Sequence, residues 1–376
     1  MFLALRELAF QRGRFVIMGA VITLIAILMV LLSGLAVGLT NDGVSGLQQM
    51  DVTSFAFQKD VSEGSAFSRS VVDPSAVEAW QNQPGVAHAA PFGNTLVNAR
   101  SNQGVEIDLA LFGVEQGSFI DPEVADGSPL SGAGQVVISE TAAEEGIGIG
   151  DIIILDPSGI ELEVVGILGG QHTFGHVDVG YISLTTWQEV SAGMRPGDDV
   201  PARVYQQFTA VAVQAESGKD LDLASGDTAA GTTSLTKKDS YDSSPGFSAE
   251  TSTLQLIQGF LYGISALVVG AFFTVLTIQR QPEIAVMRAM GASTRYLLRD
   301  SLMQSLVLLV VSASIGIAIG LAAGAAIANT SMPFAIEYGP IIGATVLLLV
   351  LGLVGAGVAI VRITRVDPLS ALGGNR

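Results

Sequence analysis

The sequence predicts an α-helical membrane protein with four transmembrane helices and one α+β extracytoplasmic domain. Of its 376 residues, 49% are hydrophobic and 14% are charged, whereas an ordinary soluble domain carries about 25% charged residues. Four stretches hold almost no charge, and the region between the first two is polar and acidic. At about 200 residues that region is long enough to form its own hydrophobic core. The chain has no cysteine, so disulfides and thiolate-bound metals play no part.

The charge-free stretches set the expected membrane spans. Phe15–Asn41 is uncharged, which exceeds the roughly 20 residues that cross a bilayer and the about 7–15 residues of a signal-peptide core. The third stretch, 301–336, is too long for one span, and Pro333 with its small polar neighbours breaks it. The expected spans are 15–40, 251–279, 301–328 and 341–361, with an outer turn at 329–340.

Charge asymmetry predicts the orientation of the chain. The candidate cytoplasmic segments 1–14, 280–300 and 362–376 hold ten basic and four acidic residues, a net charge of +6, and the remainder of the chain holds −23. Basic loops stay on the cytoplasmic side of a membrane. We therefore expect a multi-pass protein of the cell membrane with both termini in the cytoplasm and the 41–250 domain outside. The acidity of that domain argues against nucleic-acid binding.

Residues 1–14 favour a short helix on the inner membrane surface. Phe2, Leu5 and Ala9 recur at helical spacing beside Arg6 and Glu7, which is the pattern of an interfacial amphipathic helix. The same segment could also be a simple extension of the first span. We interpret it as a cytoplasmic elbow helix.

The 41–250 domain reads as mixed helix and strand. Asp73 followed by Pro74 indicates a capped helix up to Trp80. Strands are expected at 135–139, 151–155, 161–166 and 204–213, the middle two forming a hairpin, and a short helix is expected at 141–146. Residues 216–250 are rich in Ser, Thr, Gly and Asp, and we expect them to be a linker or a mobile flap.

No motif supports an enzyme. Leu130–Gln135 loosely resembles an ABC ATPase signature, but the chain has no phosphate-binding Gly-x-x-x-x-Gly-Lys-Ser/Thr motif, so a glycine-rich turn before a strand is the better interpretation. His172 and His176 stand four residues apart, yet Thr173–Gly175 does not favour a helix, so we expect a surface loop and no metal. No Ser/His/Asp arrangement is apparent, and we expect a transport subunit with no intrinsic cofactor.

The spans offer small residues, methionines and one tyrosine, with no ionisable relay of the kind that ion-coupled pumps use. Small residues allow close helix contacts. A methionine thioether is also a soft axial ligand for haem iron, and Met29 lies in the middle to outer part of the first span. Met29 can equally be packing filler.

The segment Thr277–Ser293 follows the second span on the inner side and combines an acid, two arginines and an apolar stripe that ends at Gly291. It resembles the R-x-x-E-I-x-x-x-R-A-x-G-A pattern of the FtsX/MacB-like permeases of ABC systems. The closing segment Arg362–Leu372 resembles the same family's R-V-D-P-x-x-A-L, and residues 136–151 look like its periplasmic core domain. The resemblance covers essentially the whole chain and implies that the outer domain has the MacB-like periplasmic core fold.

Within that family, the N-terminus resembles the Hrt-type haem exporter permeases. The shared features are Met1–Leu8, Gly13–Phe15, Leu35–Leu39 and Phe67–Ser70. DevC-like exporters share part of these motifs. The resemblance implies that the cargo is haem or a similar amphiphile dissolved in the membrane. Met29 is then the leading candidate ligand, and Tyr262, Glu337 and Tyr338 are the further candidates at the outer mouth.

The resemblance also implies the assembly. A homodimer of permeases in lipid would bind two copies of a separate cytoplasmic ATPase, which alone would bind ATP and magnesium. The coupling helix at 280–300 would contact that ATPase through Glu283, Arg288 and Gly291. Two other functions remain open at this point. One is force transmission to an extracellular wall hydrolase, as in FtsX-like permeases, and the other is extrusion of lipoproteins or peptides.

Overall fold

The chain folds into two compact units. The computed structural model describes residues 12–279, 286–287, 290–291, 293–330 and 332–364. Thr40–Thr251 forms one unit, called here the inserted domain, and the flanking segments Met1–Leu39 and Ser252–Arg376 form the other, called the membrane unit. Most of the predicted elbow helix and the C-terminal tail from residue 365 lie outside the described residues.

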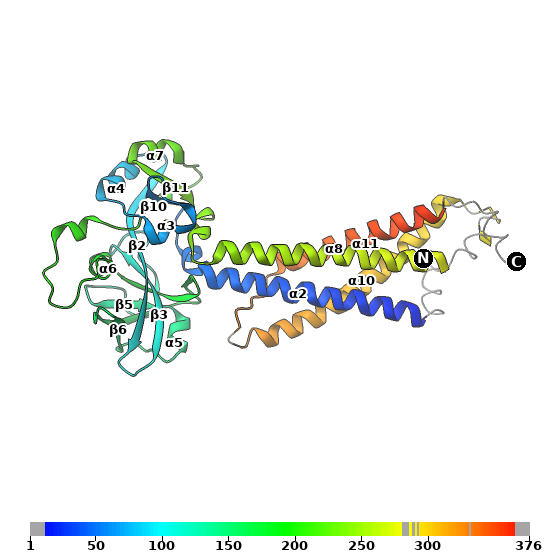
Figure 1. Ribbon diagram of the computed structural model, residues 1–376, viewed down its shortest axis with the longest axis horizontal. Coiled ribbons are helices and arrows are strands. Elements are labelled where there is room, and N and C mark those ends of the chain that lie inside the picture. Colours follow the sequence, from blue (N-terminus) through cyan, green and yellow to red (C-terminus); the bar gives the residue numbers. More distant parts are fainter. Residues whose placement is uncertain (1–11, 280–285, 288–289, 292, 331, 365–376) are drawn as a thin grey trace. The chain divides into compact units, whose positions relative to one another are not determined.

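The membrane unit consists of four long helices, and it confirms the four predicted spans (Figure 1). Each holds a stretch that is long and apolar enough to cross a membrane. The helices are α2 (Arg12–Gln49), α8 (Phe247–Gln279), α10 (Thr294–Ile327) and α11 (Tyr338–Thr364). Helix α2 continues well past the predicted end at residue 40, because Val44 and Leu47 bury their side chains in the inserted domain.

Small residues bring α2 and α10 into close contact, as the sequence predicts. A Cβ atom added to Gly316 would lie 2.5 Å from the carbonyl oxygen of Thr23, and one added to Gly320 would lie 2.9 Å from Cβ of Val30. The hydroxyl of Thr23 donates to the carbonyl of Ser312 at 3.0 Å. Glycine therefore lets the two backbones approach each other and share a hydrogen bond.

The inserted domain is built on an eleven-stranded mixed sheet with the order β11-β1-β10-β2-β3-β9-β5-β7-β4. β6 pairs with β2 and β7, and β8 pairs with β9. The strands are β1 (Ser54–Gln58), β2 (Val86–Ser101), β3 (Glu106–Val114), β4 (Val124–Gly127), β5 (Gln135–Ile138), β6 (Ile152–Asp156), β7 (Glu161–Leu168), β8 (Thr173–Phe174), β9 (Val177–Ser183), β10 (Ala210–Ala215) and β11 (Thr232–Thr236). Five short α-helices accompany them: α3 (Ala66–Arg69), α4 (Pro74–Gln81), α5 (Glu140–Glu144), α6 (Leu184–Ser191) and α7 (Leu223–Ala230).

Both faces of the sheet are buried. Successive side chains of a strand point to opposite faces, and in β3 Leu109 and Leu111 enter one core while Ala110 and Phe112 enter the other. The second core is aromatic, and Phe67 stands edge-on to Phe57 at 5.0 Å. The Phe67–Ser70 motif thus contributes a central side chain of this core.

Local sequence signals predict several elements correctly. Asp73 caps α4 by accepting from the backbone of Ser75 at 2.9 Å, and the β6–β7 hairpin pairs antiparallel. β5 and α5 also lie where they are expected. The strand expected at 204–213 begins only at Ala210, because residues 202–206 form a 3-10 helix, η2 (Ala202–Gln206).

The prediction that residues 216–250 form a linker or flap is wrong. This segment holds α7, β11 and a 3-10 helix, η3 (Asp239–Ser243). β11 pairs along all of β1, from Ser54 opposite Thr236 to Gln58 opposite Thr232. Its polar residues are used in structure, since the Asp227 carboxylate accepts from the hydroxyls of Thr232 and Ser234 at 2.7 and 2.6 Å.

Candidate functional site

An apolar groove opens on the membrane unit. Its volume is about 390 Å³ and almost all of its lining is apolar. Four leucines of α2 form one wall, and residues of α8, of the end of α10 and of the segment after α10 form the rest. The lining residues are Leu28, Leu31, Leu32, Leu35, Ile257, Leu261, Ile327, Met332 and Phe334. Such a groove can hold the hydrophobic body of a molecule dissolved in lipid.

The segment between α10 and α11 contributes Met332 and Phe334 to this groove and folds back onto α2. The backbone N–H of Ala335 donates to the carbonyl of Gly34 at 3.1 Å. A Cβ atom added to Gly34 would lie 2.2 Å from the Phe334 ring, and one added to Gly324 would lie 2.8 Å from it. We expected this turn only to connect two spans. Apolar Met332 and Phe334 flanking Pro333 were the signal that it packs against the helices.

The structure places two of the four predicted haem residues in one cluster. Met29 is buried, with 4% of its surface exposed, among residues of α2, α10 and α11, and Tyr262 packs against the same cluster. Neither lines the groove. Glu337 and Tyr338 are exposed at the start of α11. A ligand role for any of the four stays a prediction.

The predicted coupling segment is only partly described. Glu283 and Arg288 lie outside the described residues. Gly291 lies in a turn with φ of +96°, a backbone conformation that favours glycine. Ser293 then caps α10, whose first residues occupy the end of the predicted 280–300 segment. A contact between Gly291 and an ATPase stays a prediction.

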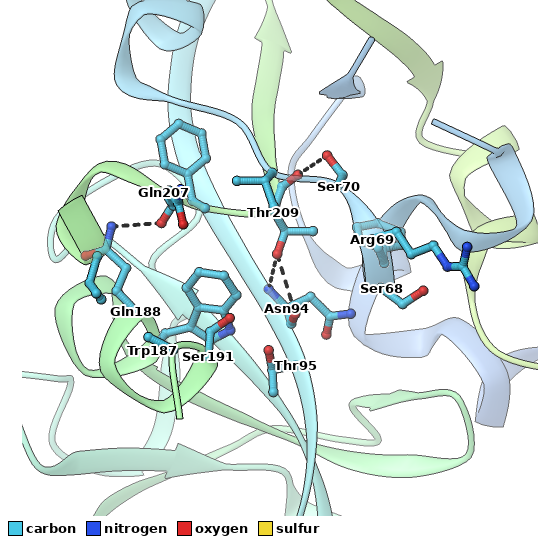
Figure 2. Close-up of a pocket in the computed structure, with 15 residues that line it drawn as sticks. Ser68, Arg69, Ser70, Asn94, Thr95, Trp187, Gln188, Ser191, Gln207 and Thr209 are labelled. Carbon is cyan, nitrogen blue, oxygen red and sulfur yellow. Dashed lines mark hydrogen bonds between the residues drawn. The ribbon is translucent and has the colours of Figure 1, made fainter. Parts of the chain in front are cut away.

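A polar pocket of about 170 Å³ lies in the inserted domain between α3, α6, β2, η2 and the residues just before β10 (Figure 2). The hydroxyl of Ser70 accepts from the backbone of Gln58 at 2.8 Å and donates to the carbonyl of Thr209 at 2.6 Å. The Thr209 hydroxyl accepts from the backbone of Asn94 at 2.9 Å. These bonds join α3 to the sheet, which gives the Phe67–Ser70 motif a structural role.

The glycine-rich turn at 130–135 is confirmed as a turn leading into a strand. The backbone N–H groups of Ser131 and Gly132 donate to the side-chain oxygen of Gln135 at 2.8 and 3.2 Å, and β5 follows directly. Among the described residues, no three His, Cys, Asp or Glu side chains gather as metal ligands.

The two spaced histidines lie on either side of the short strand β8, and not on a helix. His176 follows β8, and its ring bonds two carboxylates, those of Asp42 and Glu250. His172 precedes β8 and is buried, with 8% of its surface exposed, so the prediction of a surface loop is wrong for this residue.

Burial of His172 makes stability depend on pH. Desolvation lowers the pKa of its imidazole below the ordinary value of 6.5, and a hydrogen bond with the Gly169 backbone opposes this shift. The unfolded chain therefore binds the proton more readily, and stability present above about pH 6.5 is lost as the pH falls. In urea unfolding of the full chain, the free energy of unfolding should fall between pH 7 and pH 5. His172→Gln is expected to make that decline smaller. His88→Gln, at an exposed histidine, should leave that decline unchanged, and equal declines in all three proteins would contradict the assignment.

Comparison with known proteins identifies the family. Residues 15–230 match the MacB-like periplasmic core domain and residues 256–368 match the FtsX-like permease C-terminal region. A Staphylococcus epidermidis protein provisionally named hemin transport system permease protein HrtB is 26% identical over 100% of this chain and 99% of its own length. An uncharacterised ABC transporter permease of Mycobacterium tuberculosis is 23% identical, over 100% of this chain and 99% of its own length.

Among solved structures, the extracellular domain of the noncanonic ABC-type transporter YknZ from Gram-positive bacteria is similar at 18% identity and a TM-score of 0.35. The match covers 49% of this chain and 98% of the YknZ domain. Members of the matched families are transport subunits. Because the periplasmic core match alone spans more than half of the sequence, the chain belongs to the MacB-like and FtsX-like family of ABC transporter permeases.

Proposed function

We propose that the chain is the permease subunit of an ABC exporter that removes haem, or a similar amphiphile, from the membrane. The observation that carries the proposal is the apolar groove of the membrane unit, whose lining suits a cargo already dissolved in lipid. Two staphylococcal relatives that align over at least 99% of the chain bear names of hemin transport permeases.

In this proposal the apolar body of the cargo enters the groove beside Leu28 and Leu32. Met29 is the leading candidate to ligate haem iron through its thioether. Its side chain is buried between helices, so ligation requires α2 to shift against α10. Tyr262 packs beside Met29, and Glu337 and Tyr338 at the outer turn would meet the polar end of the cargo as it leaves.

The energy would come from a separate ATPase in the cytoplasm. Both chain termini and the 280–300 segment lie on that side in our proposal, because they carry the basic residues. Glu283, Arg288 and Gly291 would contact the ATPase, which holds ATP and magnesium. Two permeases would pair as a homodimer with two ATPases, and ATP-driven closure of the ATPases would move the helices.

A haem titration of the purified full chain in lipid nanodiscs tests the proposal. Wild-type protein should change the haem absorption spectrum, and Met29→Ala should remove the spectral signature of thioether ligation. Leu32→Ala should weaken binding about tenfold or more, since burying a leucine side chain is worth about 1.5–3 kcal/mol and 1.4 kcal/mol is about tenfold.

The matched control is Leu24→Ala, on the same helix but 57% exposed and outside the groove. It should bind haem as the wild type does. No spectral change on adding haem to the wild-type protein would rule out haem as the cargo. Such a result would favour force transmission to a partner outside the cell, which needs no bound small molecule.

A further inference from the structure

One histidine of the inserted domain lies between two carboxylates that come from different helices. Nδ1 of His176 lies 2.8 Å from Oδ2 of Asp42, near the end of α2, and Nε2 lies 3.1 Å from Oε2 of Glu250, in the first turn of α8. All three side chains are partly buried, with 25–35% of their surface exposed. We call this arrangement the histidine bridge.

The histidine bridge needs a proton. An ionised carboxylate accepts hydrogen bonds and donates none, and a neutral imidazole has only one N–H. Both ring nitrogens of His176 face carboxylate oxygens. Both bonds therefore form together only when the imidazole carries two protons and a positive charge. A neutral ring would keep one of the two bonds and leave the other carboxylate facing an unprotonated nitrogen.

The α2 side of the histidine bridge is held by other bonds as well. The Gln171 side chain donates to Oδ1 of Asp42 at 3.0 Å, and the Thr173 backbone donates to the hydroxyl of Ser45 at 2.9 Å. Gly175 donates to the carbonyl of Gly43 at 2.9 Å. The β8–β9 hairpin is therefore fixed to the end of α2 whether or not His176 is charged, and the bond to Glu250 is the one that protonation can make or break.

The backbone at His176 is also unusual. Its φ is +66°, in the left-handed region that only a few per cent of non-glycine residues enter and in which Asn, Asp and His are enriched. Such conformations are held in place by the surrounding structure and gather at functional positions. In this hairpin the conformation aims the imidazole between the two helices.

We infer that His176 is a proton-dependent positioning residue that fastens the first turn of α8 to the end of α2. Both helices continue into the membrane unit, so in a permease the histidine bridge would resist their separation when it is protonated and yield when it is neutral. Histidine is the side chain that ordinarily changes charge between about pH 5 and 8. The inference concerns motion of the chain and holds for any cargo.

Two carboxylates face the ring of His176. Asp42 faces it from α2 and Glu250 from α8. Asp178 stands on β9 of the same hairpin, where the hydroxyls of Ser139 and Thr141 donate to it. The two groups that face the ring are therefore both carboxylates, which can accept from its N–H groups.

Hydrogen exchange of the purified full chain, without haem or ATPase, tests the inference. After correction for intrinsic exchange rates, amides of residues 247–256 should be about two- to fivefold better protected at pH 5.5 than at pH 8.5, the range expected for a partly exposed ion pair. His176→Gly removes the ring and suits the positive φ. This variant should show, at both pH values, the low protection that the wild type shows at pH 8.5.

Two substitutions of Glu250 separate the proton requirement from simple packing. Glu250→Gln supplies an amide N–H that can donate to a neutral ring nitrogen, so protection should persist at pH 8.5. Glu250→Ala should lose protection at both pH values, and His88→Gln should behave as the wild type. The inference is overturned if His176→Gly keeps the pH dependence, or if Glu250→Gln behaves like Glu250→Ala.

Discussion

Replacing Gly316 with leucine is expected to prevent stable folding of the membrane unit. A Cβ at this position would lie 2.5 Å from the carbonyl oxygen of Thr23 and 2.6 Å from Cβ of Ala26. The first of these is a backbone atom, so no side-chain rotation relieves the collision. The two helices must move apart, which would also break the bond from the Thr23 hydroxyl to the Ser312 carbonyl. We expect a cost at or above the upper end of the about 1–3 kcal/mol of ordinary overpacking.

The measurement is the temperature at which the detergent-purified chain loses its monodisperse peak in size-exclusion chromatography. The matched control is Gly343→Leu on α11, where an added Cβ meets nothing within 4 Å. That variant should resemble the wild type. If Gly316→Leu is as heat-stable as Gly343→Leu, the close contact between α2 and α10 is not required for folding.

Replacing Trp80 with alanine is expected to destabilise the inserted domain by about 3–5 kcal/mol, the usual cost of removing a fully buried aromatic side chain. Trp80 has no exposed surface, and its Nε1–H donates to the hydroxyl of Thr232 at 3.1 Å. Its ring fills the space above Gly226, where an added Cβ would lie 2.2 Å away. This one side chain therefore joins α4, α7 and β11.

Urea unfolding of the full chain measures this loss. The chain has two tryptophans, so Trp187 remains as the fluorescent reporter in Trp80→Ala. The control is Leu96→Ala on β2, which is 46% exposed and should change stability by no more than about 0.5 kcal/mol. Equal unfolding midpoints for the two variants would show that the 216–250 segment does not depend on Trp80.

The membrane helices could be predicted from sequence because a span is a local property. Uncharged runs of sufficient length, such as Phe15–Asn41, mark the spans without reference to any partner. The capped helix after Asp73 and the β6–β7 hairpin were also local, since their caps and turns lie within a few residues. The structure of the 216–250 segment could not be predicted from local signals. Its strand β11 pairs with β1, which lies far back in the chain, and the segment has so few apolar residues that it resembles a linker.

The candidate sites, too, could be predicted only where the signal is local in the sequence. Met29 and Tyr262 could be proposed from residue type, and the structure places both at one cluster. The groove could not be foreseen, because three separate stretches of the chain line it. The partners of His176 could not be foreseen either, since Asp42 lies 134 residues away. The spacing to His172 drew attention to metal binding, whereas the structure places the ring of His176 between two carboxylates.

The contacts between the end of α2 and the start of α8 have a consequence for protein engineering. The Ser244 hydroxyl donates to the carbonyl of Gly43 at 2.9 Å, and a Cβ on Gly43 would lie 3.0 Å from the Phe247 ring. The chain therefore leaves and re-enters the 40–251 region at neighbouring points. A segment whose two ends meet can be cut out and replaced by a short loop, or exchanged for the corresponding segment of another permease, as a removable cassette.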